Sequence, residues 1–226
     1  MTLSNFEEDN YFLAFMDICG FKNLMKLNRE RSLQVLNNFY NIGFSTISNQ
    51  IYNREDNRKI IEISLFSDSC LLIAHNINSR LNQFKSLLEI IKTINKDFYT
   101  KSNELLMSSI VFGKFRFQNR FQDIGTSKNF IFGEGFIQAY QDNERMDPMK
   151  EAGLCCINIR NIPQGISDYL KEESILFKKR DHFYYYYFWM ASLETPANSL
   201  YKQYQNAYRN YFNKYKEIIN NSKNID

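Results

Sequence analysis

Two aspartates interrupt short apolar runs in the first third of this chain. Asp17 lies in the run 12–21, Phe-Leu-Ala-Phe-Met-Asp-Ile-Cys-Gly-Phe, and Asp68 in the run 63–73, Ile-Ser-Leu-Phe-Ser-Asp-Ser-Cys-Leu-Leu-Ile. An ionised carboxylate in an apolar strand is costly to bury unless a cation meets it. If the two strands lie side by side, a divalent metal ion is the natural third party. The pair therefore predicts a metal-dependent phosphoryl-transfer site; the alternative is two turn or cap carboxylates at strand ends.

Composition limits the class of protein and its partners. The 226 residues are 44% hydrophobic and 16% aromatic, enough to bury a full core in one domain. The 28 basic and 25 acidic residues nearly balance, so nothing favours nucleic acid or an anionic membrane as a partner. No apolar stretch approaches the roughly 20 residues that cross a bilayer. The polar, acidic first ten residues are not typical of a signal peptide, so we expect a cytoplasmic protein.

Cysteine and histidine usage argues against several other chemistries. The four cysteines lack the paired spacing of a zinc site, and we expect reduced, buried thiols. They are Cys19, Cys70, Cys155 and Cys156. The two histidines, His75 and His182, have no acid–base partner beside them in the sequence. Catalysis by a Ser-His or Cys-His pair is therefore not expected.

Apolar periodicity predicts an α+β fold. The expected strands cover 11–18, 60–66, 70–75, 105–117, 130–132 and 154–159, and the expected helices cover 21–53, 81–94 and 133–145. Residues 119–129 are polar and are expected to form a loop or hairpin tip. This order predicts a mainly antiparallel sheet with helices packed on one of its faces.

The composition changes after residue 160. A run of aromatic residues over 181–190 predicts a further strand, and the spacing of later tyrosines predicts a C-terminal helix over 201–218. We expect residues 1–160 to form the domain that carries the aspartates. Residues 161–226 would be an aromatic extension that packs on this domain or on a dimer. The run Tyr184–Tyr187 could stack on bases, but an aromatic strand more often supplies core on one face and subunit contact on the other.

Four segments resemble the class III nucleotide cyclases. Residues 15–21 resemble their first-strand motif, 66–69 their second metal-aspartate hairpin, 110–113 the strand that follows, and 132–144 the next element. The last segment, with Gly133, Tyr140 and Glu144, is closer to the pyrimidine cyclases of the bacterial Pycsar antiphage system. The resemblance covers residues 11–159, and it implies a ferredoxin-like cyclase domain.

In such cyclases the 3′-hydroxyl of a nucleoside triphosphate attacks its own α-phosphate, and diphosphate leaves. The protein mainly positions the substrate and neutralises charge. The resemblance implies that Asp17 and Asp68 bind two divalent ions, Mg²⁺ or Mn²⁺, with the carbonyl of Ile18 as a further ligand.

The substrate-binding residues follow from the same resemblance. Residues 19–24, which include Cys19, Gly20 and Phe21, lie where the first strand turns into a helix, and their free main-chain N–H groups would bind the β- and γ-phosphates. Gly20 would let the chain come close to them. Phe15 would line the ribose or base pocket or belong to the core. Tyr140 would face the site or the dimer seam.

The chain also departs from the purine cyclase pattern. The lysine and aspartate that read a purine base fall on Ser64 and Phe130, which favours a smaller or differently held base. We expect UTP to be converted to cUMP as the first choice and CTP to cCMP as the second. The asparagine and arginine that stabilise the transition state fall on Ile137 and Gln141. The residues that remain as sources of positive charge are Lys114, Arg116, Arg145 and Lys150.

The resemblance further implies a head-to-tail homodimer, with the metal aspartates from one subunit and the base contacts from the other. Its product would be a second messenger that activates an effector during phage infection. Three alternatives stay open: a purine nucleotide cyclase, an inactive cyclase fold that senses nucleotides or drives dimerisation, and an α+β interaction protein whose aspartates are structural.

Overall fold

The structure is a computed structural model that describes residues 9–52, 61–75, 79–122, 126–147, 151–173, 176–189 and Arg209, with side chains described outside 50–52 and 117–132. The strands are β1 (Asp9–Ile18), β2 (Ile61–Phe66), β3 (Ser69–Ala74), β4 (Leu106–Gln122), β5 (Thr126–Phe132), β6 (Cys155–Asn158), β7 (Phe177–Lys179) and β8 (Tyr184–Tyr187). The helices are α1 (Phe21–Leu27), α2 (Arg29–Tyr52), α3 (Arg80–Ser102), α4 (Glu134–Glu144) and α6 (Gln164–Glu172).

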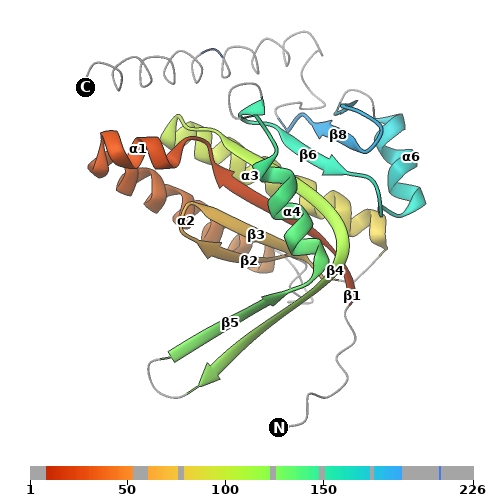
Figure 1. The fold of residues 1–226 in the computed structure, drawn as a ribbon, viewed down its shortest axis with the longest axis horizontal. Helices are drawn as coiled ribbons and strands as arrows, with labels where there is room; N and C mark the ends of the chain where they lie inside the picture. The colour runs from red at the N-terminus through yellow and green to blue at the C-terminus, as the bar shows by residue number, and fades with distance from the viewer. Residues whose placement is uncertain are drawn as a thin grey trace.

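One sheet organises the molecule (Figure 1). Its strands run in the order β2-β3-β1-β4-β6-β8-β7, with β5 paired to β4 off this path. Every pair is antiparallel except β4 with β6. The predicted α+β class and mainly antiparallel sheet are therefore confirmed.

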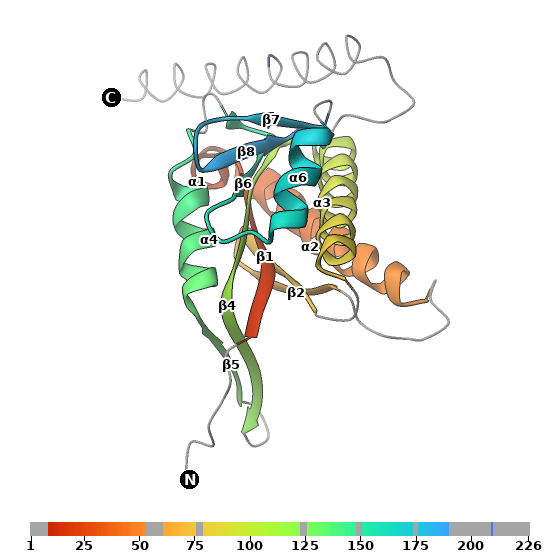
Figure 2. The same ribbon diagram turned by 90° about the vertical axis from the view of Figure 1, so that its right-hand side faces the viewer.

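Helices cover both faces of this sheet, which corrects the expectation that they pack on one. Phe12, Ala14 and Met16 of β1 share a core with α2 and α3, whereas Leu13 and Phe15 belong to a separate core with α4. Figure 2 shows α4 on the side of the sheet opposite α2, α3 and α6. The sequence of β1 explains this arrangement. Its apolar side chains lie on both faces of the sheet, so helices must cover each face to keep these side chains from water.

Helix α3 closes the larger core. It buries apolar side chains at three- and four-residue spacing, as a helix with one apolar face must: Phe84, Leu87, Leu88, Ile91, Ile94 and Phe98. The hydroxyl of Ser79 accepts a hydrogen bond from the N–H of Asn82 at 3.3 Å and caps the first turn. Asn103 ends the helix in the left-handed conformation.

The β4–β5 hairpin extends further than the sequence predicted. Residues 119–122, expected in a loop, continue β4, which pairs with β5 from Arg116–Phe132 to Gln122–Thr126. The hairpin projects beyond the packed sheet (Figures 1 and 2). Strands pair through main-chain hydrogen bonds, so a polar sequence does not exclude strands there.

The described part of 161–226 continues the same sheet. β8, which falls within the strand expected over 181–190, pairs with β6 from Cys155–Tyr187 to Asn158–Tyr184. The expected helix over 201–218 lies outside the described residues except for Arg209, and the division of the chain at residue 160 stays a prediction. Among the described residues, no helix combines the length and the apolar character needed to cross a membrane.

Close packing of α4 on β4 gives a test of the fold. A Cβ atom added to Gly135 would lie 2.9 Å from Cδ1 of Leu13 and 3.1 Å from the carbonyl oxygen of Lys114, whereas one added to Gly165 of α6 would meet nothing within 4 Å. We expect Gly135→Ala to lower the free energy of unfolding by about 1–3 kcal/mol through overpacking. Gly165→Ala should raise it by about 0.4–1 kcal/mol because the unfolded chain loses entropy. Urea titration measures both; equal effects would contradict this packing.

Candidate active site

Asp17 and Asp68 meet where β1 ends. Asp17 is the second-last residue of β1 and lies opposite Ser69, the first residue of β3. Asp68 is in the tight turn between β2 and β3, and its carbonyl oxygen accepts a hydrogen bond from the N–H of Ile18 at 3.0 Å. Ser67, with φ of 53°, turns the chain there. Both aspartates therefore lie at one end of the sheet, on neighbouring segments.

The electrostatics of this end are unbalanced. The pKa of Asp17 is raised to about 7, mainly by burial and further by the negative charges of Asp68 and Glu144, while a 2.6 Å hydrogen bond from the Ser69 hydroxyl opposes the rise. Within the described residues, no lysine, arginine or histidine forms an ion pair with Asp17 or Asp68. The site thus carries negative charge that a bound cation would balance.

The donor chemistry fits a hard divalent cation. The two carboxylates supply oxygen ligands, and Mg²⁺ or Mn²⁺ commonly completes such a site with water and substrate phosphates. The described residues hold no group of three or more His, Cys, Asp or Glu side chains that could bind a metal by themselves. The side chain of Ile18 is a hydrocarbon that packs in the core, and the main-chain carbonyl is the group of this residue that could bind a metal ion.

The turn from β1 into α1 differs in part from expectation. Gly20 adopts the left-handed conformation, with φ of 69°, and caps α1. The N–H of Cys19 donates to the carbonyl of Leu105 at 2.9 Å, so it is engaged within the sheet and does not match the expected phosphate contact. The side chain of Phe21 packs in the core. The N–H groups of Phe21 and Lys22, the first two residues of α1, have no partner within the helix.

The remaining predicted residues lie on the α4 side of the sheet. Ser64, Leu71 and Phe15 form one row across β2, β3 and β1. The Tyr140 ring meets that of Phe15 edge-on, with centroids 5.4 Å apart. Phe15 is only 3% exposed, whereas Tyr140 is 45% exposed. Tyr140 is therefore the member of this pair that a ligand can reach. The buried ring of Phe15 packs against it from the sheet.

Sequence reasoning missed Ser69 as the partner of Asp17. Its position after Asp68 marked it only as a turn residue. The register of β1 with β3, which places Ser69 opposite Asp17, reveals its role. No local pattern carries that information, because the two residues are 52 positions apart.

On the outer face of α4, uncharged residues occupy the two positions where purine cyclases have asparagine and arginine. Ile137 is 54% exposed, and Gln141 is exposed as well. The side chain of Phe130 and the whole of Lys150 lie outside the described residues.

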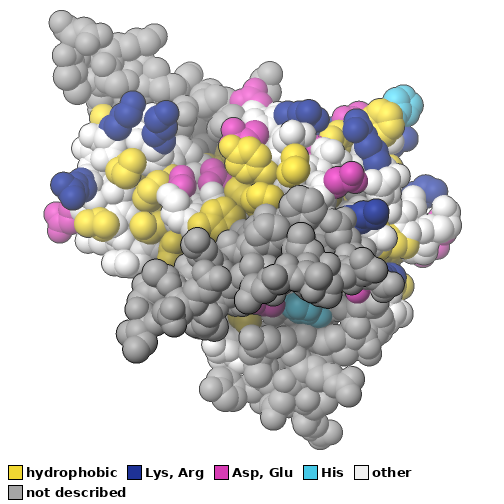
Figure 3. Space-filling view, turned by 60° about the horizontal axis from the view of Figure 1, so that its bottom comes forward, with side chains coloured by type: hydrophobic (Ala, Val, Ile, Leu, Met, Phe, Trp, Pro, Cys, Tyr) yellow, Lys and Arg dark blue, Asp and Glu magenta, His cyan; other side chains and the backbone are white. Residues whose placement is uncertain are grey.

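Figure 3 shows one face of the molecule on which hydrophobic side chains form a broad band. Large contiguous patches of exposed apolar side chains are typical of surfaces that bind partners, whereas single exposed apolar residues are common on any protein.

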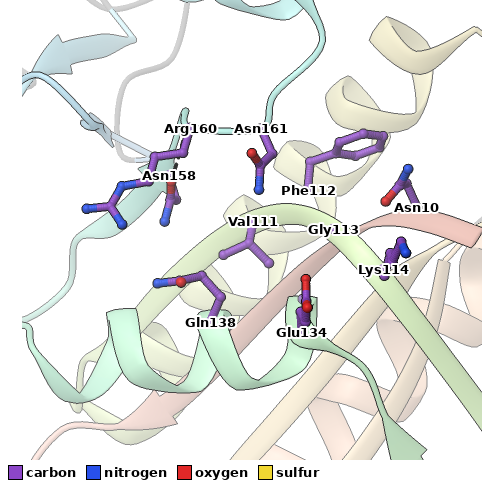
Figure 4. Close-up of a pocket in the computed structure, with 11 residues that line it drawn as sticks. Asn10, Val111, Phe112, Gly113, Lys114, Glu134, Gln138, Asn158, Arg160 and Asn161 are labelled. Atoms are coloured by element: carbon purple, nitrogen blue, oxygen red, sulfur yellow. Dashed lines mark hydrogen bonds between the residues drawn. The ribbon is translucent and has the colours of Figure 1, made fainter. Parts of the chain in front are cut away.

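A pocket of about 360 Å³ lies elsewhere, between α4, β4 and the segment that follows β6. Asn10, near the start of β1, lines it, so it is separated from Asp17 by most of that strand. Glu134 and Asn161 face one another across it, and Lys114 and Arg160 lie at opposite ends (Figure 4). This pocket is not part of the aspartate site.

Comparison with known proteins identifies the fold. No family model matches the chain, and neither does any curated protein sequence. Among solved structures, the catalytic core of a rhodopsin-guanylyl cyclase with converted specificity, in complex with ATPαS, matches with a TM-score of 0.53 at 12% identity, over 82% of this chain and 98% of that one. A bacterial light-regulated adenylyl cyclase matches with a TM-score of 0.55 at 11% identity, over 90% of this chain and 59% of that one.

A dimeric guanylyl cyclase domain of the RhoGC fusion protein from the aquatic fungus Blastocladiella emersonii also matches, with a TM-score of 0.53 at 12% identity, over 80% of this chain and 93% of that one. The fold is therefore that of the class III nucleotide cyclases, as the resemblance implied. At this level of identity the likeness concerns the fold, and the roles of individual residues stay predictions.

The raised pKa of Asp17 predicts a pH-dependent stability. The carboxyl titrates near pH 4 in the unfolded chain and at about 7 in the folded protein. Below pH 4 it is protonated in both states; as the pH rises from 4 to 7 only the unfolded state releases the proton, so stability is lost. We therefore expect metal-free Asp17→Asn to match the wild type near pH 4 and to be more stable at pH 8.

Urea titrations in EDTA at several pH values measure this difference. Asp168→Asn is the control, because Asp168 lies on the surface of α6 with its side chain 49% exposed, and it should show no such trend. Adding Mn²⁺ at pH 8 should stabilise the wild type more than Asp17→Asn. If the difference in free energy of unfolding between the wild type and Asp17→Asn does not change with pH, the raised pKa of Asp17 is contradicted.

Proposed function

We propose that this protein is a nucleotide cyclase that converts a pyrimidine nucleoside triphosphate to its 3′,5′-cyclic monophosphate and diphosphate. UTP is the first choice of substrate and CTP the second. The observation that carries the proposal is the pair of Asp17 and Asp68 at one end of a cyclase-type sheet, with burial and neighbouring negative charge raising the pKa of Asp17. Neither aspartate has a cationic partner among the described residues, which suits bound metal better than a structural ion pair.

Asp17, Asp68 and the carbonyl of Ile18 would hold two divalent ions, Mg²⁺ or Mn²⁺. When bound, such ions lower the pKa of the attacking hydroxyl and neutralise the triphosphate. The hydroxyl of Ser69 holds the Asp17 carboxylate in place through its 2.6 Å hydrogen bond. The N–H groups of Phe21 and Lys22 would bind phosphate oxygens next to the left-handed turn at Gly20.

The choice of a pyrimidine rests on what lies beside the aspartates. Ser64, at the position where purine cyclases use lysine, offers only a short hydroxyl in the same row as Phe15. The exposed ring of Tyr140 offers an apolar face for a base or ribose. A single hydroxyl with an aromatic surface suits a small base recognised by shape and few hydrogen bonds.

We also propose a homodimer, a cytoplasmic location, and a cyclic nucleotide product that activates a downstream effector in antiphage defence. Support for the dimer comes from the exposed Ile137 and Tyr140 on the outer face of α4. Neither nucleic acid nor membrane is a proposed partner. The effector and the defence role rest on the sequence resemblance alone.

A second candidate is an inactive cyclase fold that binds a nucleotide as a sensor. It is favoured by the presence of Ile137 and Gln141 on α4 in place of the asparagine and arginine that stabilise the transition state in purine cyclases. A double variant, Ile137→Asn with Gln141→Arg, would separate the two. A sensor that lacks only these groups should gain turnover in the double variant. An enzyme that already stabilises the transition state with other residues should gain little turnover.

Product analysis tests the main proposal. Purified protein with Mn²⁺ and each of the four ribonucleoside triphosphates should yield cUMP or cCMP by mass spectrometry. Asp68→Ala should reduce the rate at least about a thousandfold because it removes a metal ligand. Asp168→Ala, at a half-exposed position on α6 away from the aspartate pair, should leave the rate unchanged. Cyclic AMP or GMP would identify a purine cyclase, and binding without turnover would identify a sensor.

The dimer has its own test. Ile137→Asp places a charge on the outer face of α4 and should convert a dimer to a monomer in light scattering coupled to size exclusion. Leu33→Asp on α2 is the matched control, because Leu33 and Ile137 are each 54% exposed. If both variants stay dimeric, α4 does not form the interface.

A further inference from the structure

A buried carboxylate anchors the C-terminal half of α4. Asp142 is 4% exposed and accepts three hydrogen bonds. The donors are Nε2 of Gln138 at 2.7 Å, Nδ2 of Asn158 at 2.6 Å and the hydroxyl of Tyr184 at 2.8 Å. Gln138 and Asn158 reach the same end of the pocket from α4 and β6 (Figure 4). One carboxylate thus ties together a helix and two strands.

Tyr184 supplies the only one of these three bonds that comes from β8. The side chains of this strand alternate between the two faces of the sheet. Tyr184 and Tyr186 point to the α4 side, where Tyr186 donates to the buried carboxylate of Glu151. Tyr187 points to the opposite core, where its hydroxyl lies 3.5 Å from the carbonyl of Leu88. Strand β8 therefore carries two polar anchors on one face and apolar bulk on the other.

Helix α4 connects this anchor to the aspartate site. Tyr140, two residues before Asp142, contacts the ring of Phe15, which is two residues before Asp17 in β1. Glu144, two residues after Asp142, is close enough for its charge to act on Asp17. The Ser109 hydroxyl donates to the carbonyl of Ala139 at 2.5 Å and holds the middle of the helix to β4. The orientation of α4 thus sets where Tyr140 and Glu144 stand relative to the aspartates.

We propose that Tyr184 and Asp142 are positioning residues, through which the C-terminal strand β8 holds α4 in register with the aspartate site. Their effect on catalysis rests on the proposed function, whereas their hold on α4 does not. A hydrogen bond to a buried charge is strong, and its loss leaves the charge with one donor fewer. Removing the Tyr184 hydroxyl should therefore loosen α4 while leaving the apolar packing of β8 unchanged.

The experiment compares Tyr184→Phe with Tyr187→Phe in the full chain. Each variant removes one hydroxyl from β8, on opposite faces of the sheet. Hydrogen exchange followed by mass spectrometry should show amides of residues 138–144 exchanging about tenfold faster in Tyr184→Phe, and at the wild-type rate in Tyr187→Phe. Asp142→Asn should act on the same amides, and the double variant Tyr184→Phe/Asp142→Asn should add little to Asp142→Asn.

Steady-state kinetics with the preferred triphosphate and Mn²⁺ separate positioning from general weakening. Because Tyr140 moves with α4, Tyr184→Phe should raise KM about fivefold with kcat within about twofold, and Tyr187→Phe should change neither. Unchanged exchange of α4 in Tyr184→Phe would overturn the proposal, as would faster exchange with an unchanged KM. If the wild type forms no cyclic nucleotide, the proposed function fails, and the exchange measurement still decides whether Tyr184 holds α4.

Discussion

The antiparallel pairing of β1 with β3 is the constraint on which the candidate site depends. It places Asp17 opposite Ser69 and next to the turn that carries Asp68. If the register of β1 against β3 shifted by one residue, Asp17 would point into the core formed by α2 and α3. Burying a carboxylate among those apolar side chains would be costly. The register is held by apolar side chains on both faces of β1, so the packing of two cores determines the geometry of the site.

Electrostatic imbalance follows from that geometry. Burial and the charges of Asp68 and Glu144 all disfavour an ionised Asp17, and a single hydroxyl opposes them. A protein that carried these carboxylates only for stability would gain from replacing them by apolar residues. In the proposed enzyme a bound divalent ion would remove this imbalance, because its charge would offset the charges of the two carboxylates.

Helix α4 couples this site to the rest of the fold. It packs so closely on β4 that Gly113 and Gly135 meet backbone to backbone, with 3.1 Å between the Cα of Gly135 and a Cβ built on Gly113. Its buried Asp142 binds side chains from β6 and β8. The described part of the tyrosine-rich C-terminal segment is therefore integrated with the sheet, and two of its tyrosines anchor polar groups on the α4 side.

The sequence by itself determined most of the elements, and it led to the hypothesis that the two aspartates bind metal. Apolar runs and helical spacing predicted β1, β3, α3 and α4 because those signals are local, and the motifs around Asp17 and Asp68 pointed to a cyclase-type sheet. Only the tertiary structure decided which face α4 covers, that Ser69 binds Asp17, that the N–H of Cys19 is engaged by Leu105, and that Tyr184 binds Asp142. These contacts join segments up to 125 residues apart in sequence, the separation between Phe15 and Tyr140. They depend on which strands pair and in what register, and that choice is made by the packing of the whole core, which no local pattern encodes.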